Sequence, residues 1–594
     1  MFEKHAVAFS GRMEKKMKKI TAMILTFAMI LGVSLTLVGC GTPKDKGAEI
    51  SIYLGEEIYD FDPSEYIVDS NAEALMSLLF DPLFSTDENG KITCSAAKKY
   101  EHDEEKREIV IELKESYWSD GKRVVADDYI YAWTKLILEP ANANPAAALF
   151  YDIENVIAAK NGNVSIYDIG AKKSDVYEIT INYREGADVN RILTNLSSIA
   201  TAPLREDIIT ASPTNWSKRA TNAVFNGPFK LAVLDYEEGI LTLARNEGYH
   251  QKMTSNKYTK FVNPNVFYSS FNAEGNDIKV SYSDIEEKTV FYMTDASLAD
   301  RKANKANATV SDDLSVYSYV FNTSKPLFAI KEVRQALSMA IDRNAIIEAI
   351  TFGKAANGFI PAAIEGFRSD DLISASAAKA EANRLLSTVD FTGISKEFTV
   401  AVNDDSESLA VAELVKAAWE GLDAGFTVNV EKLGTIMTYL PSDGSDNLDS
   451  ALQVLVTEVA NDVADFDVLA IDWQLYSPDP FVGLSAFASS YSGNGVDFVT
   501  GAYRTNISGW SDANYDYYIN AAYKAEDEYE RTEALRAAEK ILVESAPIVP
   551  VVFNQNFSFA SADISGVTTD IFGNFVYNKM ALKNYQEYLD KENN

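Results

Sequence analysis

Residue types able to carry out covalent or metal chemistry are scarce in this chain of 594 residues. It has two cysteines, Cys40 and Cys94, and three histidines, His5, His102 and His250. None of them stands in an HExxH pair or at zinc-ligand spacing, and no serine lies in a GxSxG turn. A GxxxxGK[ST] phosphate loop is also missing. The sequence therefore predicts no catalytic constellation, no metal site and no cofactor, and we expect a protein that is not an enzyme.

The settings of the isolated residues agree with that expectation. His102 lies in the charged run 101–105, for which we expect a solvent-exposed turn, and His250 follows Asn246-Glu247-Gly248-Tyr249, for which we expect a loop. A lone cysteine in an exported chain can be a reactive thiol. The small and apolar residues around Cys94 predict a buried side chain instead.

Cys40 is the thiol with the clearest predicted chemistry. Four lysines between residues 15 and 19 precede the apolar stretch Ile20–Val38, and the stretch ends in Leu37-Val38-Gly39-Cys40. A basic region, an apolar region and small residues before a cut are typical of an export signal. The ending resembles the lipobox of bacterial lipoproteins, which implies that Cys40 is lipidated and that residues 1–39 are removed. Acyl chains contribute ~0.8 kcal/mol per buried methylene, so two or more chains hold a protein on a membrane.

A transmembrane anchor is the alternative interpretation, because Ile20–Val38 spans the ~18 apolar residues that suggest a membrane helix. The Gly-Cys ending and the polar residues 41–47 favour the lipid. We therefore expect a signal peptide over 1–39, a lipidated linker over 40–48 and an extracytoplasmic protein anchored to the cell membrane. The start residue (Met1, Met13 or Met17) and the number of membranes in the envelope stay open.

Charge and composition narrow the class of protein further. The whole chain carries a formal charge of -33, with 47% hydrophobic and 24% charged residues. Residues 1–39 hold six basic and two acidic side chains, so the remainder is more negative still. A body this acidic is repelled by phosphate backbones, so we expect no nucleic-acid partner. The proportions are those of a globular protein, and the length suffices for several domains.

The pattern of apolar residues alternates between strands and helices along the chain. It predicts strands at 49–54, 107–114, 229–234, 240–244, 316–321, 427–430, 466–471 and 546–553. It predicts helices at 71–80, 126–137, 332–341, 344–350, 413–422 and 532–544, and a loop at 443–447. Such interleaving is typical of α/β or α+β domains.

Several motifs, in order along the chain, resemble those of one family of proteins. They are Phe61-Asp62-Pro63, Leu78-Leu79-Phe80-Asp81-Pro82-Leu83, Trp118-Ser119-Asp120-Gly121-Lys122 with Ala126-Asp127-Asp128, Asn226-Gly227-Pro228-Phe229, Val333-Arg334-Gln335-Ala336-Leu337-Ser338-Met339-Ala340-Ile341-Asp342-Arg343 and Ala546-Pro547-Ile548-Val549-Pro550. The family is the oligopeptide, dipeptide and nickel class (family 5) of solute-binding proteins of ABC importers. One such motif would be weak support, but six in order are strong.

The resemblance implies an α/β, two-lobed fold of the class II periplasmic-binding-protein type, with an extra domain beside the first lobe. We place lobe I at 49–80, 200–318 and 546–594, the extra domain at 81–199 and lobe II at 319–545. The two crossovers between the lobes are expected near 317–322 and 547–553. Closure about a few hinge residues would bury the ligand.

The segment 472–480 is the predicted ligand-facing loop, because it resembles the family's W-x-x-D-Y-x-x-P. In peptide-binding members that Asp pairs with the α-ammonium of the ligand, and here its position holds Tyr476. An unpartnered buried ammonium costs roughly 3–5 kcal/mol, which is two to three decades of affinity. Either Asp472 or Asp479 replaces the carboxylate, or the ligand has no free α-amine there. Trp473 and Tyr476 are expected to line the cleft, with plain core packing as the alternative for Trp473.

The resemblance implies a receptor that captures peptides or peptide-like solutes and hands them to an ABC permease, with the protein acting as a monomer. Within the class, the alternatives are a peptide sensor without transport and a binder of a non-peptide solute such as a metal chelate. Outside it, the alternatives are an exported hydrolase and a surface chaperone or adhesion protein. The missing catalytic residues oppose the hydrolase. The identity, length and end groups of the ligand stay open.

Overall fold

The computed structural model describes residues 49–583 with gaps at 56–60, 64–69, 139–144, 214–215, 218–219, 236–239, 252–260, 263–265, 272–279, 365, 369, 404, 434–465, 492–505 and 578. The predicted signal peptide, Cys40 and the loop at 443–447 lie outside the described residues. Within the described ranges, no helix has the length and apolar character that crossing a membrane requires.

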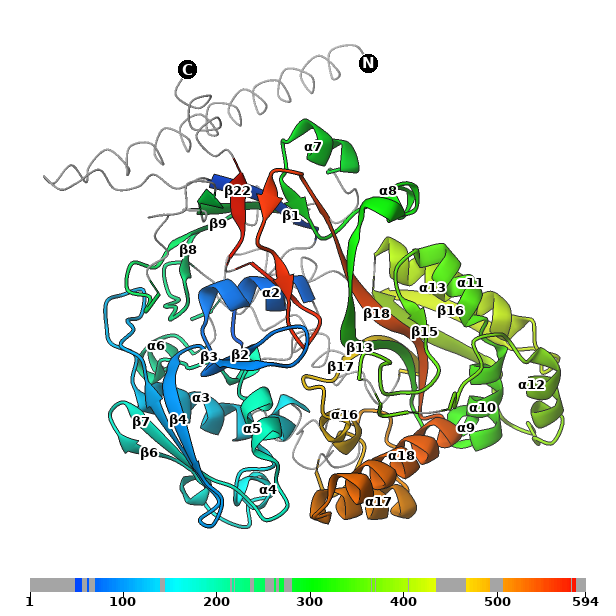
Figure 1. Cartoon of the computed structure of the whole chain (residues 1–594). Coiled ribbons are helices and arrows are strands. Elements are labelled where there is room, and N and C mark those ends of the chain that lie inside the picture. The colour runs from blue at the N-terminus through cyan, green and yellow to red at the C-terminus, as the bar shows by residue number, and fades with distance from the viewer. Residues whose placement is uncertain are drawn as a thin grey trace, which may run out of the picture. The chain divides into compact units, whose positions relative to one another are not determined.

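Eleven of the described strands form one mixed sheet (Figure 1). The order is β16-β15-β17-β13-β18-β12-β1-β11-β9-β8, and β14 pairs with β18. The bounds are β1 Glu49–Gly55, β8 Phe229–Asp235, β9 Ile240–Arg245, β11 Val266–Phe271, β12 Tyr292–Met293, β13 Thr309–Phe321, β14 Lys354–Ala355, β15 Glu397–Asn403, β16 Thr427–Leu433, β17 Val468–Gln474 and β18 Ile548–Ala560. Strands β16, β15 and β17 run parallel, and so do β11, β1 and β12.

The long strands β13 and β18 join these two parallel sets. They pair antiparallel along most of their length, but the register shifts between Asp312 and Val316. The carboxyl end of β18 pairs with β12, and the carboxyl-terminal part of β13 pairs with β17. The predicted crossovers, 317–322 and 547–553, lie largely within the two strands. The interruption between Asp312 and Val316 lies earlier in β13 than the first predicted crossover, whereas a second register shift, between Tyr317 and Ser318, lies within it. The domain boundaries proposed above stay a prediction.

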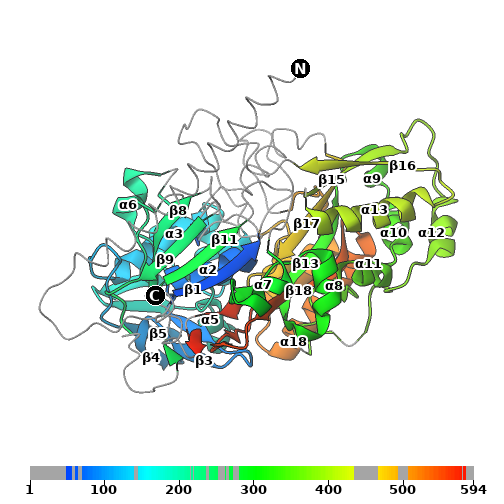
Figure 2. The same cartoon turned by 90° about the horizontal axis from the view of Figure 1, so that it is seen from above.

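Helices cover both faces of the sheet, and smaller sheets flank it. The helices are α2 Ser70–Leu79, α3 Ala126–Leu138, α4 Val156–Lys160, α5 Val189–Asn195, α6 Glu206–Ala211, α7 Tyr282–Glu287, α8 Leu298–Asn304, α9 Pro326–Ala329, α10 Lys331–Ala340, α11 Arg343–Ile350, α12 Lys379–Leu386, α13 Ser406–Glu420, α16 Pro480–Ser485, α17 Ala513–Lys524 and α18 Glu528–Ser545. Short 3-10 turns lie at η1 Pro145–Phe150, η2 Ile166–Asp168, η3 Ile199–Thr201 and η4 Lys305–Asn307. Figure 2 shows α10, α12 and α13 gathered beside β15 and β16.

A four-stranded antiparallel sheet, β4-β5-β7-β6, lies entirely within residues 97–182. The remaining strands are β2 Phe84–Thr86, β3 Ile92–Cys94, β4 Ala97–Asp103, β5 Glu108–Leu113, β6 Ala171–Asp175, β7 Glu178–Asn182, β10 Phe261–Val262, β19 Ile564–Ser565, β20 Thr568–Thr569, β21 Phe575–Val576 and β22 Ala581–Lys583. That sheet falls inside the range proposed for the extra domain.

The motif around Trp118 builds a turn and starts a helix. Trp118 is buried, and its indole Nε1 donates to Asp128 Oδ2 at 2.9 Å, while the backbone N of Val125 donates to the same oxygen. Gly121 has φ +88°, which suits glycine best. Asp128 therefore holds the turn onto the first turn of α3, as the Asp-Asp sequence at a helix start predicts.

The Val333–Arg343 motif anchors the crossover strand β18. Arg334 donates from Nε and Nη2 to the carbonyl of Ser545 at 3.0 and 2.7 Å. Arg343 donates from Nε to the carbonyl of Pro550 at 2.9 Å. Both guanidiniums are buried, and burial lowers the pKa of Arg343 to about 9 and of Arg334 to about 10. These two arginines fix the chain on either side of residues 546–549.

Most predicted elements are confirmed, with three corrections. His102 lies on strand β4 rather than in a turn, because its ring Nε2 meets the hydroxyl of Tyr183 at 2.6 Å beside the ladder; the turn follows at 104–107. Cys94 is half-buried on β3 rather than buried. Helix α13 begins at Ser406 and not at 413, because Asp405 caps it by accepting from the backbone N of Glu407 and Ser408. His250 lies in the predicted loop, but buried against Asp81.

Candidate functional site

The carboxyl ends of the parallel strands from both sets mark the candidate site. In open α/β sheets, ligands bind in the crevice outside these ends. Strand β1 ends at Gly55 and β12 is followed by Asp295, while β15 is followed by Asp405 and β17 by the loop that contains Tyr476. A Cβ on Gly55 would lie 2.3 Å from Cβ of Asp295, so the ends of β1 and β12 are in direct contact.

Asp472 lies at the end of β17 and bonds to both crossover strands. Its Oδ1 accepts from Nδ2 of Asn554 on β18 at 2.6 Å. The same Nδ2 lies 2.8 Å from Oγ of Ser315 on β13, and that hydroxyl donates to Asp313 at 2.6 Å. This chain of contacts crosses the place where the β13–β18 ladder is interrupted. The predicted site residue Asp472 is thus tied to the structure that joins the two parallel sets.

Arg301 links the two sets of strands at the same end. On α8, which follows β12, it donates to Asp295 at 2.8 Å and to the carbonyl of Ala296 at 2.8 Å. Its Nη1 also bonds to the carboxylate of Glu407 on α13. Its guanidinium lies 4.8 Å from the ring centroid of Phe557. Arg301, which follows β12, therefore forms an ion pair with Glu407, which follows β15, and so connects the two sets of strands.

The carboxylates of this region repel one another. Burial raises the pKa of Asp472 to about 7, against the hydrogen bond from Asn554, and the charges of Glu407, Asp405 and Asp313 add to the rise. Burial also raises the pKa of Glu407, which Arg301 lowers in part. The Glu407 side chain is nevertheless 36% exposed. Glu407 is thus partly exposed to water while it stays ion-paired with Arg301.

Trp473 points away from Asp472, to the other face of β17, as the period of two in a strand requires. It is 3% exposed and stacks on Phe487 with 4.8 Å between ring centroids, and Phe359 meets it edge-on. Among the described residues, its indole Nε1 finds no hydrogen-bond partner. Trp473 is therefore part of an aromatic cluster, and it carries one unmatched buried donor.

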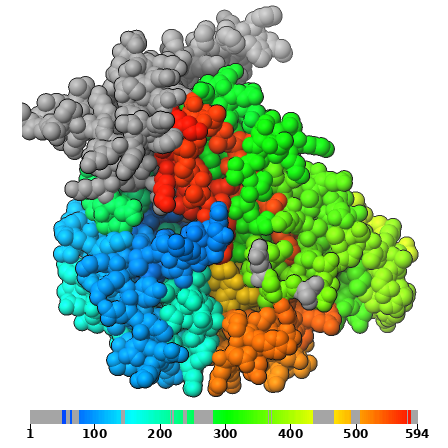
Figure 3. All heavy atoms as spheres, viewed as in Figure 1, coloured from blue at the N-terminus to red at the C-terminus, as the bar shows by residue number. Residues whose placement is uncertain are grey.

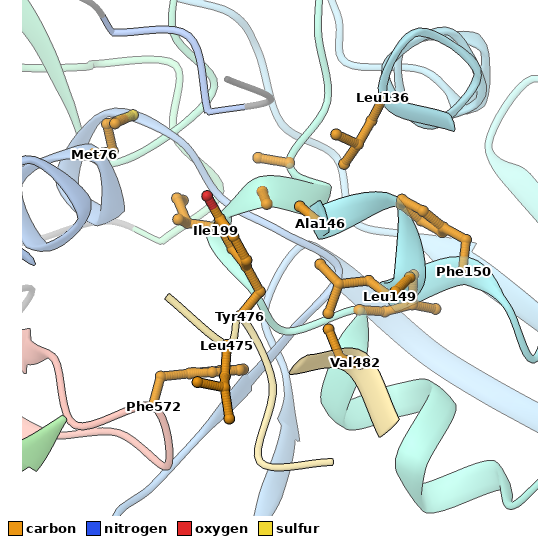
Figure 4. Close-up of a cluster of buried hydrophobic side chains, with 14 of the residues drawn as sticks. Met76, Leu136, Ala146, Leu149, Phe150, Ile199, Leu475, Tyr476, Val482 and Phe572 are labelled. Atoms are coloured by element: carbon orange, nitrogen blue, oxygen red, sulfur yellow. The ribbon is translucent and has the colours of Figure 1, made fainter. Parts of the chain in front are cut away.

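Tyr476 is buried in an apolar cluster that other segments complete. It is 3% exposed, and Figure 4 shows its side chain pointing toward Ile199, with Met76, Ala146 and Leu149 nearby. Its backbone has φ +61°, which is uncommon for a residue with a large side chain. On the face of the molecule shown in Figure 3, the residues that follow β17, in gold, are visible between the cyan and orange parts of the chain. The ring of Tyr476 is thus packed among apolar side chains.

Asp479 belongs to a buried ion-pair network. Its carboxylate accepts from Nη2 of Arg531 at 2.8 and 2.7 Å and lies 3.6 Å from Nε of Arg191. It also caps α16 by accepting from the backbone N of Phe481. Burial raises the pKa of Asp479, and the two guanidiniums lower it by more, so the net shift is downward. Its charge is already compensated within the protein.

The structure brings Asp472 together with Asp295, Arg301, Asp405 and Glu407, and places Trp473, Tyr476 and Asp479 around a neighbouring cluster. Sequence reasoning missed the first set except Asp472. One signal was available: Asp404 and Asp405 directly follow an alternating run at 397–403, which is the position of ligand groups in parallel sheets. No pattern along the sequence pointed to Asp295 or Arg301. Among the described residues, no group of three or more His, Cys, Asp and Glu side chains is arranged to hold a metal ion.

Comparison with known families identifies the class. Residues 91–495 match the model of the bacterial extracellular solute-binding proteins, family 5, middle region. The chain belongs to this family of solute-binding proteins, which confirms the resemblance found in the motifs. Its members are receptors outside the cytoplasm.

Individual relatives extend over nearly the whole chain. The chain is 24% identical to the dipeptide-binding protein DppE of Bacillus subtilis, over 96% of this chain and 100% of the relative. It is also 24% identical to the oligopeptide-binding protein OppA of the same organism, over 93% and 97%. The pheromone receptor PrgZ superposes with a TM-score of 0.74 at 19% identity, over 90% of this chain and 99% of that one. Peptide-bound OppA of Listeria monocytogenes gives 0.73 at 20% identity, over 90% and 99%. The two-lobed α/β fold expected from the sequence is confirmed.

Proposed function

We propose that this protein is a receptor that captures peptides or peptide-like solutes between its two sets of parallel strands and delivers them to an ABC importer. The observation that carries the proposal is the convergence of Asp472, Glu407, Asp405, Asp295 and Arg301 at the carboxyl ends of both sets. The names of its relatives support peptides as the solute, since DppE and OppA are dipeptide- and oligopeptide-binding proteins.

The receptor is held at the outer surface of the cell membrane by lipid on Cys40, and it works as a monomer without catalytic activity, metal or cofactor. The Leu37–Cys40 sequence supports the anchor. Binding would need only closure around the solute, after which the loaded protein docks on the permease.

For ligand contact we favour Asp472 over Asp479. Two arginines already compensate Asp479, whereas the neighbours whose charges act most on Asp472 are themselves acidic. Trp473 would offer its indole Nε1 and ring to the ligand. Tyr476 would close the apolar side of the pocket and would leave no carboxylate for an ammonium at that position.

The test is native mass spectrometry of the full-length protein, extracted from membranes in mild detergent, followed by denaturing release of whatever it carries. Co-purified peptides are the expected result. Release of a metal chelate or another non-peptide solute would keep the receptor and replace the ligand class. A protein that is empty and gains no thermal stability from a peptide library would overturn the proposal.

Lipid on Cys40 is tested on the same sample. The expected result is a mass for the N-terminal peptide that begins at residue 40 and carries acyl groups. An unmodified chain that keeps residues 1–39 would contradict the anchor without affecting the ligand assignment.

A further inference from the structure

We propose that this receptor carries a latch, a contact between residues 146–199 and residues 476–531 that keeps its two sets of parallel strands closed on each other before a ligand binds. Arg191 is the central residue of this latch, and it acts through the closure and not through contact with the ligand. The inference rests on the proposed receptor function, because it concerns the motion by which the solute is captured.

The two sides of the latch belong to segments that are attached to different sets of strands. Residues 84–211 lie between α2 and β8, and the side-chain amide of Asn226, just before β8, exchanges two hydrogen bonds with the backbone of Asp81. Helices α16, α17 and α18 lie between β17 and β18, and Phe487 after α16 stacks on Trp473 of β17. A change in the angle between the two sets, at the interrupted ladder of β13 and β18, would therefore separate the two segments.

Arg191 on α5 bridges the two sides of the latch. Its Nε donates to Asp152 on its own side at 2.6 Å and lies 3.6 Å from Asp479 on the other side. Its Nη1 lies 3.6 Å from Glu528, which is also on the other side. Burial lowers the pKa of Arg191, and the charges of the three carboxylates raise it by more. The guanidinium therefore stays charged and attracts acids of both segments.

Hydrogen bonds between uncharged groups continue the contact. The hydroxyl of Ser477 donates to Oδ1 of Asn195 at 2.7 Å. The hydroxyl of Tyr523 donates to the carbonyl of Tyr151 at 3.2 Å, and the hydroxyl of Tyr151 donates to the carbonyl of Tyr491 at 3.3 Å. Every donor and acceptor in these bonds belongs to the protein, so the latch can form without a ligand.

An apolar cluster completes the latch. Figure 4 shows Tyr476 pointing toward Ile199, and Val482 of α16 beside Leu149 of η1. All four side chains are buried. Separation of the segments would expose them to water, and each Å² of apolar surface kept from water contributes about 25 cal/mol. This burial favours the closed state whether or not a solute is present.

Arg191→Gln is the substitution that weakens the latch without leaving a buried charge alone. Asp152 would keep its pair with Arg184 at 2.6 Å, and Asp479 would keep its pair with Arg531 at 2.7 Å. We therefore expect the variant to fold. What it loses is the attraction between the two segments, which we expect to lower the ratio of closed to open protein ~10-fold, a typical coupling for neighbouring side chains.

The experiment measures the distance between two spin labels by pulsed electron paramagnetic resonance. The protein is full-length, in mild detergent, and freed of its co-purified ligand by unfolding and refolding. The labels replace Tyr167 and Tyr517, which are 84% and 66% exposed and lie on opposite sides of the latch, in a Cys94→Ser background.

We expect the ligand-free parent to show a population at the short distance of the closed structure, and Arg191→Gln to shift protein from this population to longer distances. A parent that shows longer distances alone would overturn the latch. A variant with the same distance distribution as the parent would overturn it as well.

Two further variants separate the latch from general destabilisation. Arg205→Gln is the matched control, because Arg205 is also a buried arginine, but it pairs with Asp120 and Asp207 inside the segment 84–211. It should keep the distance distribution of the parent, and a loss of closed protein equal to that of Arg191→Gln would refute the assignment. Tyr523→Phe removes one hydrogen bond of the latch and should lower the ratio of closed to open protein ~3-fold.

Peptide affinity shows whether Arg191 acts through closure or through the ligand. The probes are Ala-Gln-Ala and Ala-Phe-Ala, measured by isothermal titration calorimetry. Apparent affinity scales with the fraction of binding-competent protein, so Arg191→Gln should weaken both probes by one common factor of at most ~10. Factors that differ by more than ~3-fold between the probes would place Arg191 at the ligand and overturn the latch. A parent that binds neither probe would remove the peptide assignment, while the label distances would still decide the latch.

Discussion

Asp479→Asn is the substitution that most directly tests the buried network next to the loop. The side chain is 7% exposed, and its partner Arg531 is 5% exposed. Asparagine keeps the size and the cap of α16, because Asn and Asp cap helices about equally well. The change therefore removes the negative charge and little else. Among the described residues, Glu528 would be the acid left near Arg531, at 3.7 Å and 68% exposed, while Arg191 would keep Asp152 at 2.6 Å.

Removing one partner of a buried ion pair costs about 3–5 kcal/mol, because the other charge stays buried without compensation. The contact between Asp479 and Arg531 is double, with both carboxylate oxygens in hydrogen-bond range, so we expect a loss near 3–5 kcal/mol in the free energy of unfolding. The assay is urea unfolding, followed by both fluorescence and circular dichroism to check that the transitions coincide.

The control is Glu112→Gln, which removes a pair with Lys98 that has 59% and 34% exposed side chains. Such exposed pairs contribute less than about 1 kcal/mol. The double variant Asp479→Asn/Arg531→Met should recover part of the loss, because it no longer buries an uncompensated guanidinium. An Asp479→Asn protein that is as stable as the Glu112→Gln protein would refute the reasoning.

Substitutions at three further residues follow from the geometry. Arg343→Met should lower the free energy of unfolding by about 2–4 kcal/mol in urea, since the carbonyl of Pro550 loses its charged donor. Tyr476→Ala should cost about 3–5 kcal/mol through the cavity it leaves, and Tyr476→Gly should cost ~1 kcal/mol less than Ala, because φ is +61°; a glycine variant less stable than the alanine variant would contradict this. Folding raises the pKa of Asp472 from 3.8 to about 7, so the folded state holds an extra proton between those values and stability falls as pH rises from about 4 to 7. The stability difference between Asp472→Asn and the parent should therefore favour the variant more at pH 8 than at pH 5. The change in this difference should stay below ~4 kcal/mol, since one pKa unit corresponds to ~1.4 kcal/mol and water reaches the half-buried side chain. Equal pH profiles of the two proteins would show that Asp472 titrates normally.

Local patterns predicted most of the elements correctly. The strand at 107–114 and the helix at 332–341 are β5 and α10, because their apolar residues follow periods of two and 3.6 without interruption. The hairpin of β8 and β9 is also confirmed. Several elements were missed, among them β15 and the amino-terminal half of α13. Strand β15 does alternate, with Phe398, Val400 and Val402 buried and the residues between them half-buried, so its pattern was available and was overlooked.

The site was harder to predict than the fold, for a physical reason. The loop after β17 stands out in the sequence because Asp472, Trp473, Tyr476 and Asp479 are close together along the chain. The structure distributes them over different surroundings: the strand alternation sends Asp472 and Trp473 to opposite faces, and Asp479 turns to Arg531. Proximity in sequence along an extended strand is therefore a poor guide to a common site.

The group of Asp295, Arg301, Asp405, Glu407 and Asp472 has the opposite character, because its members are far apart in the sequence and close in space. Arg301 and Glu407 are 106 residues apart, and Asp472 and Asn554 are 82 apart. Within each set the parallel strands end at one edge, and the two sets run in opposite directions along β13 and β18, so that these two edges meet. The sequence could supply that rule only if β12 and β15 had been recognised as parallel to β1 and β17. Strand β12 has two residues, so its place in the sheet comes from pairing with β1 and β18 and not from its own composition. The grouping of these charges is thus a property of the assembled sheet, which is why the structure shows it and the motifs do not.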